Sequence, residues 1–133
     1  MLLGFEHIGM TSRNLDRTIG FYCDLLGLKL VLRKQGDVGD TAFLDSGSGM
    51  LEIFGRTERT GISRDVPHYE AGVRHITFAF DDIDVLFEKL VAAGIEPVEK
   101  PRPARYTEMF RRVAFVRDPD GILVELVERT VSR

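Results

Sequence analysis

Short hydrophobic runs separated by turn residues dominate the chain, and the most distinctive run lies near the C-terminus. Residues 122–127 are apolar at five of six positions and follow the sequence Asp118-Pro119-Asp120-Gly121, in which Pro and Gly favour a tight turn. Apolar residues on both faces predict a strand that is covered above and below. Glu125 interrupts this run, and burying a carboxylate without partners would cost roughly several kcal/mol. We therefore expect Glu125 to be neutralised, paired or bound to a cation.

The pattern around Glu125 occurs twice in the chain. Landmarks of the N-terminal half return in the same order 67 to 73 residues later: His7-Ile8 as His75-Ile76, Leu15-Asp16 as Ile83-Asp84, Gly27 as Gly94, Ala42-Phe43-Leu44 as Ala114-Phe115-Val116, and Leu51-Glu52-Ile53 as Val124-Glu125-Leu126. Such self-similarity predicts two copies of one module. We assign residues 1–57 to the first module, 58–71 to a polar linker and 72–133 to the second module.

Each module is predicted to contain a strand, a helix and three further strands, which gives an α+β fold of two tandem βαβββ modules. Period-two patterning and helical spacing of apolar residues define these elements. The expected strands are 5–10, 28–33, 40–45 and 50–54 in the first module, and 75–80, 96–99, 112–117 and 122–128 in the second. The expected buried helix faces are Leu15, Ile19, Tyr22 and Leu26, and Ile83, Phe87, Leu90 and Val91. Ser12 or Asn14 and Asp81 or Asp82 are candidate N-caps, and Gly27 and Gly94 stand where a left-handed C-terminal cap favours glycine.

Composition narrows the class of protein. The 133 residues are 44% hydrophobic and 29% charged with a net charge of −3, which is ordinary for a globular domain and gives no reason to expect a nucleic-acid partner. The single cysteine, Cys23, excludes an internal disulfide and fits a reducing compartment, and we expect it to pack in the first helix. No stretch approaches the ~20 apolar residues needed to span a bilayer, and the first residues do not resemble a signal peptide. We expect a cytoplasmic protein that does not bind membranes.

Each module carries one histidine and one glutamate on the same face. Successive side chains of a strand point to opposite faces, so His7 points away from the face of Ile8 and Met10. For the same reason Glu52 points away from the face of its apolar neighbours. The second module repeats this arrangement with His75 and Glu125. If approximate symmetry relates the modules, all four side chains reach a common cavity. Two imidazoles and two carboxylates suit one divalent Ni, Zn, Co, Mn or Fe ion and leave coordination positions open for substrate.

Structural roles for these residues are the alternative. A single strand histidine is usually hydrogen-bonded in the core or on the surface, and a single strand glutamate usually lies at a solvated edge. A repeat that served packing alone would preserve hydrophobic positions and glycines, whereas here two polar residue types recur. The recurrence therefore favours the metal site.

These residues together resemble those of the vicinal oxygen chelate superfamily, and within it the glyoxalase I (lactoylglutathione lyase) branch. The resemblance is carried by His7, Phe21-Tyr22 with Leu26-Gly27-Leu28, Glu52, His75, and Asp118-Pro119-Asp120-Gly121 leading to Glu125-Leu126. It implies paired βαβββ modules whose curved mixed sheets form a metal-binding cup, and a homodimer. It also implies an isomerase or lyase that acts through a metal-bound enediolate, with Glu52 and Glu125 as catalytic base and acid in an unassigned order. The implied substrate is a glutathione hemithioacetal or another anionic thiol adduct.

Two positions depart from bacterial glyoxalase I. Where that enzyme has Arg four residues after the first ligand and Asn four residues after the second, this chain has Thr11 and Arg56. Arg56 could still bind a substrate carboxylate. The segment 99–112 is predicted to be a basic mobile lid or a solvated loop. Its candidate substrate-binding residues are Lys100, Arg102, Arg105, Met109 and Phe110.

Other functions of the superfamily stay open at this point. One alternative is another metalloenzyme, namely an epimerase, a dioxygenase or a thiol transferase. The other is a metal-free binding protein like those that confer bleomycin resistance. The third histidine, His68, lies in the linker without a counterpart in the other module, and we expect it to be exposed and not a ligand.

Overall fold

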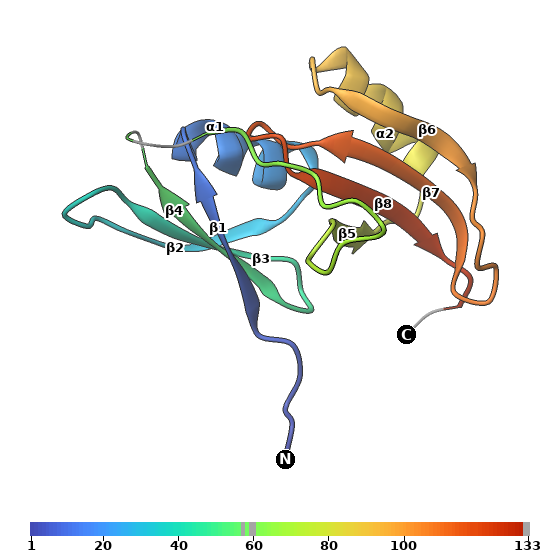
Figure 1. Ribbon diagram of the computed structural model, residues 1–133, viewed down its shortest axis with the longest axis horizontal. Coiled ribbons are helices and arrows are strands. Elements are labelled where there is room, and N and C mark those ends of the chain that lie inside the picture. Colours follow the sequence, from blue (N-terminus) through green and yellow to red (C-terminus); the bar gives the residue numbers. More distant parts are fainter. Residues whose placement is uncertain (57, 59–60, 132–133) are drawn as a thin grey trace. The chain divides into compact units, whose positions relative to one another are not determined.

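The computed structural model describes residues 1–56, 58 and 61–131, and the chain divides into two compact units, Met1–Gly61 and Ile62–Arg133 (Figure 1). The predicted linker, 58–71, spans this division. Thr57 at the predicted end of the first module, Arg59 and Thr60 in the linker, and Ser132 and Arg133 at the C-terminus lie outside the described residues. Among the described residues, no helix is both long and apolar enough to cross a membrane.

The first unit is a four-stranded mixed sheet with one helical segment. Its elements are β1 (His7–Ser12), α1 (Leu15–Ile19), the π-helical turn η1 (Gly20–Leu25), β2 (Lys29–Lys34), β3 (Thr41–Asp45) and β4 (Met50–Gly55). The strand order is β1-β4-β3-β2. Only the β1–β4 pair is parallel, because the helical segment connects β1 to the rest of the sheet.

The second unit repeats this topology. Its elements are β5 (Ile76–Ala79), α2 (Ile83–Ala92), β6 (Pro97–Pro103), β7 (Phe110–Arg117) and β8 (Leu123–Arg129). The order β5-β8-β7-β6 matches that of the first unit, again with a parallel pair of first and last strands. The predicted α+β fold of two βαβββ modules is therefore confirmed (Figure 1).

The helices begin and end where the sequence predicts. Asn14 accepts a hydrogen bond from the Arg17 amide at 3.1 Å, and Asp82 accepts one from the Val85 amide at 3.2 Å. Gly27 (φ +93°) and Gly94 (φ +86°) adopt the left-handed conformation, which a residue with a side chain adopts at a cost. Each helical segment therefore has a defined start and stop within its own module.

The main core of each unit lies between its helical segment and one face of its sheet. In β4, Leu51 and Ile53 are buried while Glu52 between them is not, and the neighbouring β3 alternates in the same way. In the second unit α2 buries Ile83, Phe87 and Leu90. Burial of Val91 was predicted wrongly: it is 45% exposed, because it lies at the margin of the face that the other three residues form.

The prediction of a single loop over residues 99–112 was wrong. β6 extends to Pro103 and pairs with β7, which already begins at Phe110. Proline cannot donate to a ladder and is therefore confined largely to edge strands, and β6 is an edge strand with prolines at 97, 101 and 103. Because residues 100–103 of β6 include no apolar residue other than proline, the predicted strand ended at residue 99.

Candidate functional site

In the first unit, His7 and Glu52 come from the two parallel neighbours β1 and β4. His7 Nε2 lies 3.6 Å from Glu52 Oε1. The edge of the Phe43 ring packs against the imidazole, with 6.3 Å between centroids and an interplanar angle of 82°. Phe43 is the residue opposite Glu52 in the antiparallel β3–β4 pair, so three adjacent strands position this histidine–glutamate pair.

The second unit builds the same pair from equivalent positions. His75, immediately before β5, has its Nε2 atom 3.2 Å from Glu125 Oε1 of β8. Phe115 lies opposite Glu125 and packs edge-on against His75 at 5.6 Å and 85°. Thr77 adds a contact, since its hydroxyl donates a hydrogen bond to Glu125 Oε1 at 2.8 Å. The predicted pairing of histidine and glutamate within each module is thus present in both units.

All four side chains are partly accessible. The histidines are 37% and 32% exposed, Glu52 is 25% exposed and Glu125 is 14% exposed. The prediction that β8 is covered on both faces holds in part: the face with Val124 and Leu126 is fully buried, and on the other face Val127 is buried in a cluster with Ala104 and Val113 while Leu123 and Glu125 are partly exposed.

The geometry of each pair fits a divalent transition metal. Ligand atoms held about 2.1 Å from one ion at neighbouring coordination positions lie roughly 3.0–3.4 Å apart. The nitrogen–oxygen separations of 3.6 Å and 3.2 Å are close to this range, and imidazole with carboxylate is a donor set that such ions accept. Binding of one ion by both pairs stays a prediction.

A cleft of about 720 Å³ adjoins the pair of the second unit. Its lining includes His75 and Glu125, and around them Arg74, Arg102 and Arg105. The aromatic side chains of Tyr106 and Phe110 form its apolar part, and His68, Glu99, Ala104 and Val113 complete the lining. The cleft is therefore basic and partly aromatic, and it opens next to a candidate metal ligand.

The predicted substrate-binding residues do not all reach this cleft. Arg102, Arg105 and Phe110 line it, whereas Lys100 and Met109 lie on the same hairpin outside the lining. Arg56 belongs to the other unit, where it is exposed at the end of β4 and its amide donates to the Ser12 carbonyl at 2.7 Å.

Sequence patterns did not assign Arg74 to the cleft. The only signal was its position directly before His75. His68 is exposed, as expected, yet it also lines the cleft.

The sequence pattern of the Glyoxalase/Bleomycin resistance protein/Dioxygenase superfamily matches residues 4–126. The chain belongs to this superfamily. A "Probable lactoylglutathione lyase" from Synechocystis is 30% identical over 128 residues, which cover 96% of both chains.

Two solved structures share the fold. A mutant of glyoxalase I from Zea mays aligns with a TM-score of 0.79 and 25% identity, over 96% of this chain and 46% of the maize chain. An antibiotic binding protein from Streptomyces, TnmS3, aligns with a TM-score of 0.70 and 18% identity, over 96% of this chain and 97% of that one. The second likeness concerns the fold alone, so the choice between an enzyme and a binding protein depends on the residues of the site.

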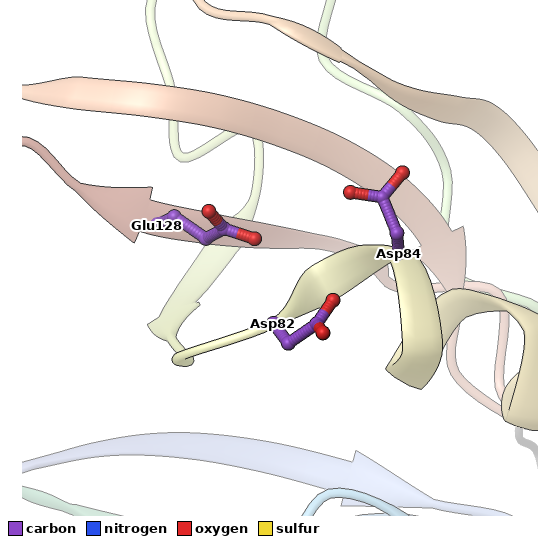
Figure 2. Close-up of side chains that lie close together, drawn as sticks. All are labelled: Asp82, Asp84 and Glu128. Atoms are coloured by element: carbon purple, nitrogen blue, oxygen red, sulfur yellow. The ribbon is translucent and has the colours of Figure 1, made fainter.

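This superfamily member also carries a group of carboxylates that the sequence did not single out. Asp82, Asp84 and Glu128 have ligand atoms within 4.8 Å of one another, and Glu128 is buried (Figure 2). Acidic groups this close either bind a cation or are neutralised by other side chains.

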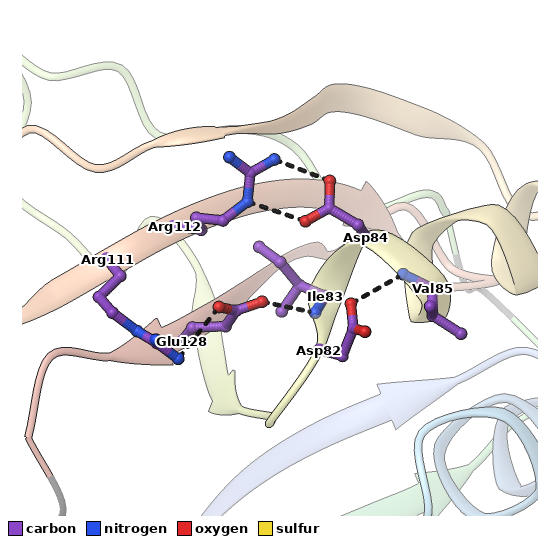
Figure 3. Close-up of polar contacts among 7 residues, drawn as sticks. All are labelled: Asp82, Ile83, Asp84, Val85, Arg111, Arg112 and Glu128. Atoms are coloured by element: carbon purple, nitrogen blue, oxygen red, sulfur yellow. Dashed lines mark hydrogen bonds and ion pairs between the residues drawn. The ribbon is translucent and has the colours of Figure 1, made fainter.

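Neighbouring groups satisfy these carboxylates (Figure 3). The Arg112 guanidinium donates to both oxygens of Asp84 at 2.8 and 2.7 Å, and Asp84 raises the pKa of Arg112. Glu128 accepts from the Ile83 amide at 2.9 Å and from Arg111 at 3.3 Å. The group therefore anchors the start of α2 to β7 and β8, and we assign it a structural role.

Replacing Glu128 by Ala is expected to destabilise the protein. The variant leaves the buried amide of Ile83 without its acceptor, which costs about 1–3 kcal/mol. Urea unfolding followed by circular dichroism measures the loss, and Glu88→Ala on the exposed side of α2 is the matched control. An unchanged midpoint for Glu128→Ala would show that this anchor contributes nothing.

Proposed function

We propose that the protein is a metal-dependent isomerase of the glyoxalase I type, which acts on an anionic thiol adduct such as the hemithioacetal of methylglyoxal and glutathione. The observation that carries the proposal is the histidine–glutamate pair built at equivalent positions of both units. The lactoylglutathione lyase name of the Synechocystis relative supports it.

The proposed ligands are His7, Glu52, His75 and Glu125, which together would hold one divalent Ni, Zn, Co, Mn or Fe ion. Both pairs could come from one chain or from the two chains of a homodimer. When bound, such an ion polarises a substrate oxygen and stabilises negative charge that develops on it. The donor set is chemically suited to these ions, and four protein ligands leave room for substrate oxygens.

The carboxylates supply the proton transfer. A carboxylate oxygen of Glu52 or Glu125 removes the proton from the substrate carbon that carries sulfur, and this carbon becomes the thioester carbonyl. The proton is returned to the neighbouring carbon, where the former carbonyl becomes a hydroxyl. The reaction is an internal redistribution of two hydrogens and needs no external oxidant or reductant. Positioned acid–base groups of this kind contribute typically 10²–10⁴-fold in rate.

The basic cleft is proposed to hold the anionic part of the substrate. Arg74 and Arg105 line it, and within the described part of the chain no carboxylate forms an ion pair with either. Guanidinium groups bind carboxylates through paired hydrogen bonds, and Phe110 offers an apolar surface for the thiol adduct. Arg102 already bonds Glu99 at 3.3 Å, so it would contribute by exchanging partners. We also propose that the substrate contacts three residues outside the cleft lining, namely Lys100, Met109 and Arg56.

Metal removal tests the proposal directly. Protein purified without chelator is expected to contain about one ion per complete set of four ligands, because these donors bind transition metals tightly. Dialysis against a chelator should abolish hemithioacetal isomerisation, and adding Ni, Co or Zn should restore it. Less than a few tenths of an equivalent, without gain on adding these ions, would contradict the proposal and favour a binding protein.

A second arm of this experiment tests the substrate class. Hemithioacetals of methylglyoxal with glutathione and with uncharged 2-mercaptoethanol differ in the anionic groups that the arginines would bind. We expect kcat/KM to favour glutathione at least ~10-fold, which one charge-assisted hydrogen bond supplies. Equal values for the two thiols would remove the anion-binding role from the cleft.

A further inference from the structure

The second unit contains another, smaller cleft of about 550 Å³ beside the basic cleft. His68, Arg74 and His75 belong to the lining of both clefts. The rest of the smaller cleft is lined by Asp65, Val66, Pro67, Phe115 and Leu123. Its volume lies within the range of roughly 300–1,000 Å³ that is typical of small-molecule sites. The proposed isomerisation assigns no role to this smaller cleft.

The linker segment 62–68, which precedes β5 in Figure 1, forms one wall of the smaller cleft. The Arg117 guanidinium on β7 donates two hydrogen bonds to the Asp65 carboxylate, at 2.8 and 2.9 Å. The Ser63 amide donates to the Asp120 carbonyl at 2.8 Å. These contacts hold the wall in place before any ligand arrives, and a preformed site avoids the cost of ordering a loop on binding.

Apolar side chains make up half of this lining. Val66 and Pro67 belong to the linker segment, whereas Phe115 and Leu123 come from β7 and β8. All four are half-buried, so a ligand that covered them would remove further apolar surface from water. Burial of apolar surface is favourable in proportion to its area. The smaller cleft therefore favours a ligand with an apolar body.

A positive charge lies at the same cleft. Arg74 is exposed, and within the described part of the chain no carboxylate pairs with its guanidinium. The carboxylate in the lining, Asp65, is already bound to Arg117 and does not neutralise Arg74. A guanidinium binds a carboxylate through paired, charge-assisted hydrogen bonds. The exposed ring of His68 offers a further donor.

We propose that the smaller cleft is a binding site for a carboxylic acid with an apolar body of about the size of phenylacetate. Arg74 holds the carboxylate, and the apolar body lies against Phe115, Leu123 and the linker segment. This inference goes beyond the proposed function, because none of these contacts requires a metal ion or a thiol adduct. Since Arg74 also lines the basic cleft, a bound acid competes there with the anionic part of the substrate.

Titration with phenylacetate, followed in the ¹H–¹⁵N NMR spectrum, tests the site. We expect the amide signals of segment 62–68 and Leu123 to shift, with a dissociation constant of roughly 1 mM or lower for a ligand of this size. The affinity should be equal for the protein as purified and after treatment with a chelator. Phenylacetamide lacks the charge and acetate lacks the apolar body, so each should bind at least ~10-fold more weakly.

Two variants of exposed arginines separate the proposed contact from general charge. Arg74→Gln should weaken phenylacetate binding at least ~10-fold and bring it close to that of phenylacetamide. Arg64→Gln removes the same charge from the same linker segment outside the lining of both clefts and should retain the wild-type affinity. Circular dichroism checks that both variants are folded.

The outcomes for this site are independent of those for the proposed function. Equal phenylacetate affinities of Arg74→Gln and Arg64→Gln would overturn the role of Arg74. Acetate that binds as tightly as phenylacetate would overturn the apolar part of the site, and the absence of shifts in segment 62–68 would overturn the site as a whole. A protein that binds phenylacetate but neither a metal nor a hemithioacetal would retain this inference and lose the proposed function.

Discussion

Glu52→Gln and Glu125→Gln should each lower hemithioacetal turnover by at least ~10²-fold, which is the scale of lost acid–base catalysis. Gln keeps the length and an amide oxygen but cannot accept a proton at that oxygen under the assay conditions. Each variant removes a candidate base that is also a proposed metal ligand, so we expect turnover to fall and metal content to change in both. Initial rates at saturating substrate, together with the metal content of each variant, measure both effects.

The control for these variants removes a carboxylate from an exposed part of the second unit. Glu88→Gln changes the same charge on the surface of α2 and should have wild-type turnover. Full turnover in both Glu52→Gln and Glu125→Gln would refute the proposed mechanism. Loss of turnover in only one of the two variants would assign the base to the unit that carries it.

His7→Ala and His75→Ala should each reduce the affinity for Zn²⁺ or Ni²⁺ by more than ~10²-fold. Removing even a group that orients a ligand costs 10–100-fold in metal affinity, so loss of a direct ligand is expected to exceed that range. Competition titration with a chromophoric chelator gives the dissociation constants and the stoichiometry. His68→Ala is the matched control, since His68 is exposed and is not a proposed ligand. It should retain the metal affinity of the wild type.

This comparison also distinguishes one shared ion from two separate ions. If both pairs hold the same ion, either histidine variant weakens all of the metal binding. If each unit bound its own ion, His7→Ala would remove one class of sites and leave the other at full affinity. The second outcome would contradict the four-ligand site while keeping each pair as a metal-binding element.

The candidate site was predictable from sequence as far as short-range rules apply. Strand alternation decides which side chains share a face, so His7 and Glu52, and likewise His75 and Glu125, could be placed together once the repeat was recognised. Hydrogen-bonding residues before each helix and glycines after it gave the boundaries of the helical segments, and the structure confirms them at Asn14 and Asp82.

Contacts between strands distant in sequence escaped prediction. Glu128 looked like one more polar residue at a strand end, but the folded chain places its carboxylate at the amide of Ile83, 45 residues away. The strand prediction stopped at residue 99 because an edge strand needs few apolar residues, and only the pairing with β7 shows that β6 continues to Pro103.

The sequence by itself determined the repeated module, the residue types of both pairs and the face on which each lies, because these follow from the local periodicity of strands and helices. Only the tertiary structure decided that Thr77 bonds Glu125, that Gly9 lies in register with Glu52, and that Arg74 and Arg105 line the same cleft. Strand register fixes the first two and the packing of a hairpin fixes the third, and both depend on which distant segments pair with each other.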